Sequence, residues 1–122
     1  MATSTLTTQE VATRLVELCR KGQVLEAQEE LFADEVTSYE PAHSPTPPAI
    51  GKDAVMAKGR HFAASIEKRH GGSFEDPIVG GNYFSFVCKF DADLKGMGRV
   101  VWDEICVLGV KEGKIISEQF FY

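Results

Sequence analysis

The sequence lacks any long apolar run and any cluster of basic residues. No apolar stretch approaches the roughly 18 residues that a bilayer-crossing helix needs, and the polar start over residues 1–8 has no signal-peptide pattern. The 13 basic residues are scattered along a chain of net charge −5, so no row of phosphates would be neutralised. We therefore expect a cytoplasmic protein that binds neither a membrane nor nucleic acid.

Cysteine pairs and metal-binding motifs are also missing. Cys19, Cys88 and Cys106 form no CxxC pair, so we expect reduced, mostly buried thiols and no disulfide framework. The histidines do not have the spacing of a known metal site. The sequence therefore predicts neither a metal site nor a cofactor.

What is present is the composition of an ordinary folded domain, with 43% hydrophobic and 25% charged residues among 122. One domain spanning the whole chain is expected. Thr7 and Glu10 form a capping-box pattern that predicts a first helix over about residues 8–20. Gly22 separates it from a second short helix over about residues 24–32.

A short strand and a third helix are expected next. Residues 36–40 have a strand pattern that ends at Pro41, and four prolines keep the following loop extended and free of helix. After Gly51, apolar residues recur at helical spacing. They predict a longer third helix that ends near Gly71-Gly72.

From Ser73 onward the pattern has period two, with turn signals at residues 80–82, 95–96 and 111–113. Four antiparallel strands are expected. In the strand that begins at Tyr83 the even-numbered residues are apolar, so they should face the core.

The last hairpin extends this assignment to the final strands. A three-residue loop over 111–113, with Gly113 at positive φ, would pair Val110 with Lys114 and keep even-numbered residues on one face. The expected inward residues are Trp102, Glu104, Cys106, Leu108, Ile116, Glu118, Phe120 and Tyr122.

The opposite face of these strands is apolar as well. It carries Val101, Ile105, Val107 and Phe121. A sheet that is apolar on both faces needs two covers, and three helices can supply only one. We therefore expect a homodimer through the sheet.

This order of elements resembles the nuclear transport factor 2-like fold, in which helices and a bent sheet enclose a cone. The run Phe-Ala-Asp-Glu-Val-Thr-Ser-Tyr-Glu-Pro at 32–41 resembles the ketosteroid isomerase segment leading to its catalytic acid, and Glu40 falls at the general-base position. The ending from Gly113 to Tyr122 resembles the last strand of SnoaL-like domains, the polyketide cyclase branch. The resemblance implies a cone-shaped α+β fold with three N-terminal helices packed on a bent, mostly antiparallel sheet.

Two positions depart from the isomerase pattern. Ketosteroid isomerase builds its oxyanion hole from a tyrosine and a protonated acid. This chain has Leu15 and Val16 in the region of the tyrosine, and Cys106 falls at the position of the late-strand acid. The isomerase substrate is therefore not carried over.

Glu40 and Glu104 are the candidate catalytic residues. An inward carboxylate among aromatic side chains loses water, which raises its pKa and suits it to exchange protons near neutral pH. Two such acids in one cavity would have different protonation states and different roles. One would stay protonated and donate a hydrogen bond to a developing oxyanion, and the other would accept the proton.

Each assignment has a structural alternative. Glu40 could instead lie at an exposed rim or pair with one of three basic residues, Lys52, Lys58 or Arg60. A one-residue bulge would turn Glu104 outward and bring Asp103 in. Glu118 could form a bridge to a basic residue near the wide mouth of the cone.

The other inward side chains suit a small hydrophobic molecule. The predicted ligand contacts are Trp102, Met56, Phe62, Phe86, Glu118, Phe120, Tyr122 and, from the proline-rich loop, His43. Two functions stay open. One is cofactor-independent acid–base catalysis of isomerase, cyclase or dehydratase type on a small carbonyl compound. The other is a non-catalytic ligand-binding or dimerisation module.

Overall fold

The computed structural model describes residues 5–122, which form three helices and seven strands. The first part contains α1 (Thr8–Arg20), α2 (Val24–Leu31), β1 (Phe32–Tyr39), β2 (Ala49–Ile50) and α3 (Lys52–Ser65). The second contains β3 (Ile66–Phe74), β4 (Ile78–Gly80), β5 (Tyr83–Leu94), β6 (Gly98–Lys111) and β7 (Lys114–Phe121). Within residues 5–122, no helix is long and apolar enough to cross a bilayer.

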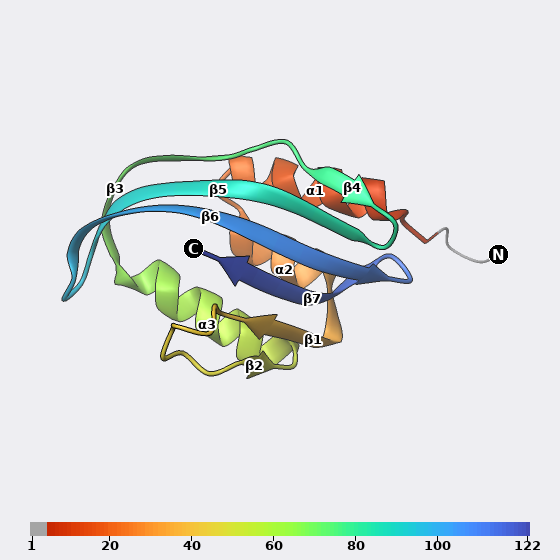
Figure 1. The fold of residues 1–122 in the computed structure, drawn as a ribbon, viewed down its shortest axis with the longest axis horizontal. Helices are drawn as coiled ribbons and strands as arrows, with labels where there is room; N and C mark the ends of the chain where they lie inside the picture. The colour runs from red at the N-terminus through yellow and green to blue at the C-terminus, as the bar shows by residue number, and fades with distance from the viewer. Residues whose placement is uncertain (1–4) are drawn as a thin grey trace.

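All seven strands belong to one sheet, in the order β2-β1-β7-β6-β5-β3, with β4 paired to β5 outside this path. β1 and β7 run parallel, and the other pairs are antiparallel. Figure 1 shows α1 and α2 behind the sheet, while α3 lies close to β1 and β2. The expected α+β architecture, three helices on a mostly antiparallel sheet, is confirmed.

The first helix begins and ends where the sequence indicates. The Thr7 hydroxyl accepts a hydrogen bond from the Glu10 amide at 3.1 Å, and the Glu10 carboxylate accepts one from the Thr7 amide at 2.9 Å. Gly22, just beyond the helix, has φ 75°, a backbone conformation that glycine adopts without strain. The predicted capping box and the boundary near residue 20 are therefore confirmed.

The third helix is shorter than its predicted extent. It ends at Ser65, and the next nine residues form β3, so Gly71 and Gly72 lie inside a strand. Pairing with β5 shifts register beside Gly71, and a Cβ on Gly72 would collide with the Lys89 carbonyl oxygen. These glycines permit a bulged strand to approach its neighbour closely, and they do not stop a helix.

The pairing of β5 with β6 is unbroken from Tyr83↔Gly109 to Leu94↔Gly98. Glu104 therefore lies opposite Cys88 on the inward face, and Asp103 is exposed. The alternative in which a bulge exchanges these two acids is excluded.

The last hairpin differs from its predicted register. Glu112 and Gly113, with φ 52° and 76°, form a two-residue turn, so Val110 pairs with Ile115 instead of Lys114. The pairing then shifts between Gly109 and Val110. Positive φ at Glu112, which non-glycine residues adopt uncommonly, is the reason that the loop is shorter than expected.

This shift restores the predicted parity farther along β7. Leu108 pairs with Glu118 and Cys106 with Phe120, so even-numbered residues again lie opposite one another. At the turn itself Ile115 is fully buried, in place of the predicted Ile116. The predicted alignment of Glu118 and Phe120 with the even-numbered residues of β6 is therefore confirmed.

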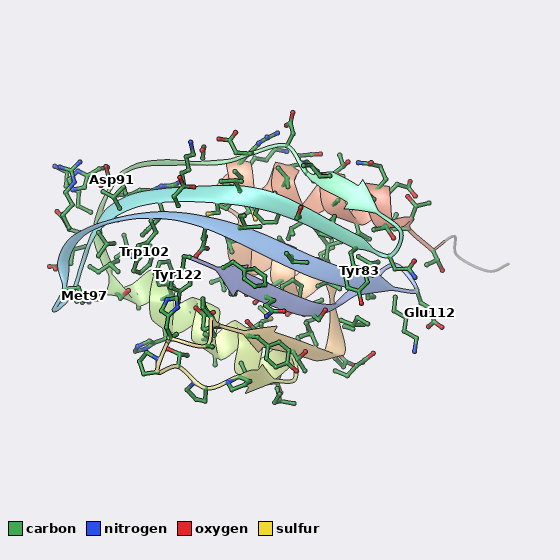
Figure 2. The ribbon with its side chains drawn as sticks, in the orientation of Figure 1. Tyr83, Asp91, Met97, Trp102, Glu112 and Tyr122 are labelled. Carbon is green, nitrogen blue, oxygen red and sulfur yellow. The ribbon has the colours of Figure 1, made fainter. Side chains whose placement is uncertain are left out.

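The core lies between the helices and the inward face of the sheet. Its most buried large side chains are Val11, Val16, Leu31, Val36, Val55, Phe84, Leu108 and Ile115. The outer face, which is toward the viewer in Figures 1 and 2, carries exposed apolar side chains among charged and polar ones. It carries Tyr83, Val101, Ile105 and Phe121, whose exposed fractions are 59%, 71%, 48% and 45%.

Candidate functional site

The candidate site forms where the ends of β1, β6 and β7 approach α3. The parallel pairing of β1 with β7 places Ser38 directly beside Glu118. Glu40 follows the end of β1, and Tyr122 follows the end of β7. Figure 2 shows Tyr122 next to Trp102. Residues from the first third of the chain and from its C-terminal strand therefore meet in one place.

Glu40 is held by two hydrogen-bond donors. Its Oε2 lies 2.7 Å from Nζ of Lys58, and its Oε1 accepts a hydrogen bond from the Tyr122 hydroxyl at 2.8 Å. The Glu40 side chain is only 13% exposed, so it does not lie on an exposed rim. Of the alternatives considered for Glu40, the ion pair with Lys58 is the one that forms.

Tyr122 keeps its proton in this contact. Burial first, and then the hydrogen bond to Glu40, raise the pKa of Tyr122 above its ordinary value. A neutral phenol is the form that can donate to a carboxylate. Tyr122 is therefore a fixed donor to Glu40 at physiological pH.

Glu118 reaches Lys58 through a serine. The Ser38 hydroxyl donates to Oε1 of Glu118 at 2.8 Å, and Nζ of Lys58 donates to the Ser38 oxygen at 3.0 Å. Glu118 is 7% exposed and Ser38 is fully buried. Burial raises the pKa of Glu118 to about 7, although Ser38 and Lys58 act in the opposite direction.

Within residues 5–122, the hydrogen-bond donor that Glu104 contacts is a weak one. Oε1 of Glu104 lies 3.9 Å from the Cys106 sulfur, which is a weak contact. Burial first, and then the charges of Glu40 and Glu118, raise the pKa of Glu104 to about 7, with Lys58 and the Cys106 contact opposing. An acid with such a pKa can both give and take a proton near neutral pH.

Aromatic rings form a continuous wall beside these acids. Trp102 lies 5.9 Å, centroid to centroid, from both Phe62 and Phe90, and 6.4 Å from Tyr122. His43 meets the Tyr122 ring edge-on at 5.8 Å. We call these five side chains, which come from the proline-rich loop, α3, β5, β6 and the C-terminus, the ring wall.

The remaining predicted contacts lie in different places. Phe120 lies beneath Lys58, with Nζ 5.2 Å from the ring centroid. Phe86 is buried and stacks on Phe84 at 6.4 Å, so it fills the core. Met56 is half-buried on α3 and takes part in none of the contacts described above.

The sequence pattern alone predicted no role for Ser38, and it predicted Lys58 only as a possible ion-pair partner of Glu40. One signal for Ser38 was present. Val36, Ser38 and Glu40 have the same parity in a strand, so a small polar residue occupies an inward position two residues before the acid. Its partner, Glu118, is 80 residues away and could not be recognised locally.

Two open hollows lie on the surface away from this site. One, of about 260 Å³, is lined by residues of α1 and β3 including Cys19 and Arg69. The other, of about 570 Å³, lies along α1 and reaches Asp76. Neither includes Glu40 or Glu104, so a preformed pocket around these acids stays a prediction. Among residues 5–122, no three His, Cys, Asp or Glu side chains are placed to hold a metal ion.

Three helices on this bent, mixed sheet define the nuclear transport factor 2-like class of α+β fold. A protein with a ketosteroid isomerase-like fold from Catenulispora acidiphila, solved with trimethylamine, matches with a TM-score of 0.72 at 20% identity, over 95% of this chain and 87% of that one. A candidate SnoaL-like polyketide cyclase from a Jannaschia species matches with a TM-score of 0.74 at 14% identity, over 99% and 90% of the two chains.

The family follows from two closer matches. The family model described as the SnoaL-like domain matches residues 6–122. A candidate SnoaL-like polyketide cyclase from Mesorhizobium loti is 38% identical, with a TM-score of 0.90, over 96% of this chain and 100% of that one. The chain therefore belongs to the SnoaL-like domain family. The comparison with curated proteins gives no match.

Proposed function

We propose that this domain binds a small hydrophobic carbonyl compound against the ring wall and transfers a proton on it. Glu40 is the base that removes a proton from carbon beside the carbonyl. Glu104, in its protonated form, donates a hydrogen bond to the carbonyl oxygen, and Trp102 supports the flat part of the ligand. No cofactor takes part in this step.

The main support for the proposal is that the two acids, Glu40 and Glu104, have different hydrogen-bond donors. Glu40 accepts hydrogen bonds from Lys58 and Tyr122, whereas Glu104 contacts only the weak Cys106 donor among the contacts described. Negative charge at Glu40 favours a proton on Glu104. An ionised acid and a protonated acid in one site are what enolisation of a carbonyl compound requires.

The relative from Mesorhizobium loti supports a cyclase-type role, because it is described as a candidate polyketide cyclase. Cyclisation of a polyketide begins with removal of a proton from carbon beside a carbonyl group. The reaction class is therefore consistent with the two acids.

A non-catalytic ligand-binding module is the second candidate. The ion pair between Glu40 and Lys58 at 2.7 Å favours it, since such a pair can serve structure alone. The position of both hollows away from Glu40 favours it too. In this case the ring wall would bind the ligand and no proton would move.

The outer face supports an assembly proposal for either function. Val101 and Ile105 on β6 and Phe121 on β7 are exposed apolar side chains on adjacent strands. Such a patch is costly to leave in water and suits a second copy of the same sheet. The proposed assembly is a homodimer through this face.

A thermal-shift screen of flat hydrophobic ketones and phenols tests the binding site. A compound that binds the native state raises the melting temperature of the wild type. The shift should shrink in Glu40→Gln and Glu104→Gln but persist in Glu35→Gln, which changes an exposed glutamate of β1. Equal shifts in all four proteins would mean that the ligand binds elsewhere. If no compound stabilises the wild type, the proposal of a carbonyl ligand is wrong.

A further inference from the structure

A continuous chain of hydrogen bonds connects Glu40 to the buried acid Glu118. It runs from Glu40 to Lys58 at 2.7 Å, from Lys58 to Ser38 at 3.0 Å, and from Ser38 to Glu118 at 2.8 Å. Every link has a length typical of a real hydrogen bond. The Glu40 and Lys58 side chains are 13% and 28% exposed, whereas Ser38 and Glu118 are 0% and 7% exposed, so the Ser38–Glu118 end of the chain is the buried one.

We propose that Glu40, Lys58, Ser38 and Glu118 form a proton relay, in which the proton that Glu40 accepts passes inward to Glu118. The inference deepens the proposed function and rests on it for the origin of that proton. Glu118 then acts as an internal proton store, and the ligand-contact role predicted for it is replaced. Lys58 and Ser38 act through Glu40, so they are positioning residues and not catalytic ones.

The transfer balances without any further reactant. The transfer starts from the state in which Lys58 is an ammonium and Glu40 and Glu118 are carboxylates. After Glu40 takes a proton from the substrate carbon, Nζ of Lys58 gives a proton to the Ser38 oxygen while the Ser38 hydroxyl proton moves to Oε1 of Glu118. The neutral lysine then takes the proton from Oε2 of Glu40. One proton has moved from Glu40 to Glu118, and Lys58 and Ser38 are unchanged.

The surroundings of Glu118 make it a suitable acceptor. Burial holds its pKa about where a proton is shared evenly at neutral pH. The titratable or charged groups that act on it or respond to its charge are Glu40, Lys58, Glu104, Cys19 and Cys106. Burial raises the pKa of both cysteines far enough to keep them neutral thiols, so they do not compete for the proton.

The relay also explains how Glu40 can act as a base although it forms an ion pair with Lys58. A carboxylate that simply held its proton would leave Glu40 neutral beside an unpartnered ammonium. Passing the proton inward restores the Glu40–Lys58 ion pair after each transfer. Glu104 is outside the chain and keeps its own proton for the carbonyl oxygen.

Proton exchange at Glu118 tests the relay in the whole protein without any ligand. With glutamate labelled at the carboxyl carbon, carbon NMR follows each acid through its titration. In the wild type the relay connects Glu118 to water, so its protonated and ionised forms should interchange rapidly and give one averaged signal. Ser38→Ala and Lys58→Met each break the chain. The exchange rate at Glu118 should then fall by roughly 100-fold, the size of a general acid–base contribution, with broadened or separate signals.

Two controls separate a relay from a structural hydrogen bond. Ser38→Thr keeps the hydroxyl and should retain rapid exchange, and Glu104, outside the chain, should stay averaged in every variant. Loss of a merely structural bond would shift the Glu118 pKa but leave its exchange rapid. If Ser38→Ala does not fold, Lys58→Met decides the question. Rapid exchange at Glu118 in Lys58→Met would overturn the relay. A failed ketone screen leaves this result unaffected, so the two ideas fail separately.

Discussion

Ser38 on β1 and Glu118 on β7 are neighbours in a parallel strand pair, and the Ser38 hydroxyl lies 2.8 Å from the Glu118 carboxylate. Both side chains are almost completely buried. A carboxyl group in this position needs its donor, because an unsatisfied buried acceptor is costly. The pair connects the inner end of the site to Lys58 and, through it, to Glu40.

Ser38→Ala should destabilise the fold, and more so at high pH. The substitution leaves Glu118 without its hydroxyl donor, a loss of about 1–3 kcal/mol for a buried group. The loss should be greater at about pH 8, where Glu118 is ionised, than at about pH 5, where it is protonated. Urea unfolding at both values measures it. An equal loss at the two values would contradict a role for the ionised acid.

Glu118 should make the wild-type protein less stable as pH rises. Its pKa is about 7 in the folded state and 4.5 as a reference, so the folded state binds more protons between these values. The free energy of unfolding should therefore fall across this window, by up to about 3 kcal/mol for the full shift. Glu118→Gln should remove the part of this fall that Glu118 contributes, whereas the part from Glu104, whose pKa is also raised to about 7, should remain. Glu35→Gln should leave the whole fall in place.

Lys58→Met should raise the pKa of both Glu104 and Glu118. The Lys58 charge lowers both values in the wild type, so its removal favours the protonated acids. Glu40 also loses its ion-pair partner, which should cost about 1–3 kcal/mol for a group that is mostly buried. Carbon NMR and urea unfolding measure these effects. Lys68→Met, an exposed change on β3, should alter neither.

Ile105→Glu should separate the proposed dimer. Ile105 lies opposite Phe121 on the outer face, so a two-fold interface would bring the new charges into an apolar contact. Sedimentation should show a dimer for the wild type and a monomer for this variant. Met97→Lys, at the exposed turn between β5 and β6, should remain dimeric. A monomeric wild type would contradict the proposed dimer.

Features that depend on alternation along one strand could be predicted from the sequence. Glu104 and Trp102 lie on the inward face because β5 and β6 pair without interruption over their whole length. The capping box of α1 is equally local. Each of these depends on residues close together in the chain, where the pattern is unambiguous.

Features set by distant partners could not be predicted in the same way. The run after Ser65 has a helical pattern, yet pairing with β5 makes it a strand. The Lys58 contacts of Glu40 and Ser38 join α3 to β1 across 18 and 20 residues, and Tyr122 reaches Glu40 across 82. Such contacts follow from the packing of whole elements, so local spacing carries little information on them.

Hydrogen–deuterium exchange at the carbon beside the carbonyl of a bound ketone tests proton transfer by Glu40 most directly. In heavy water, proton NMR should show that the wild type and Glu35→Gln catalyse this exchange. Glu40→Gln should slow it by roughly 100-fold or more, the scale of a general base. Binding without exchange in the wild type, or undiminished exchange in Glu40→Gln, would contradict proton transfer by Glu40.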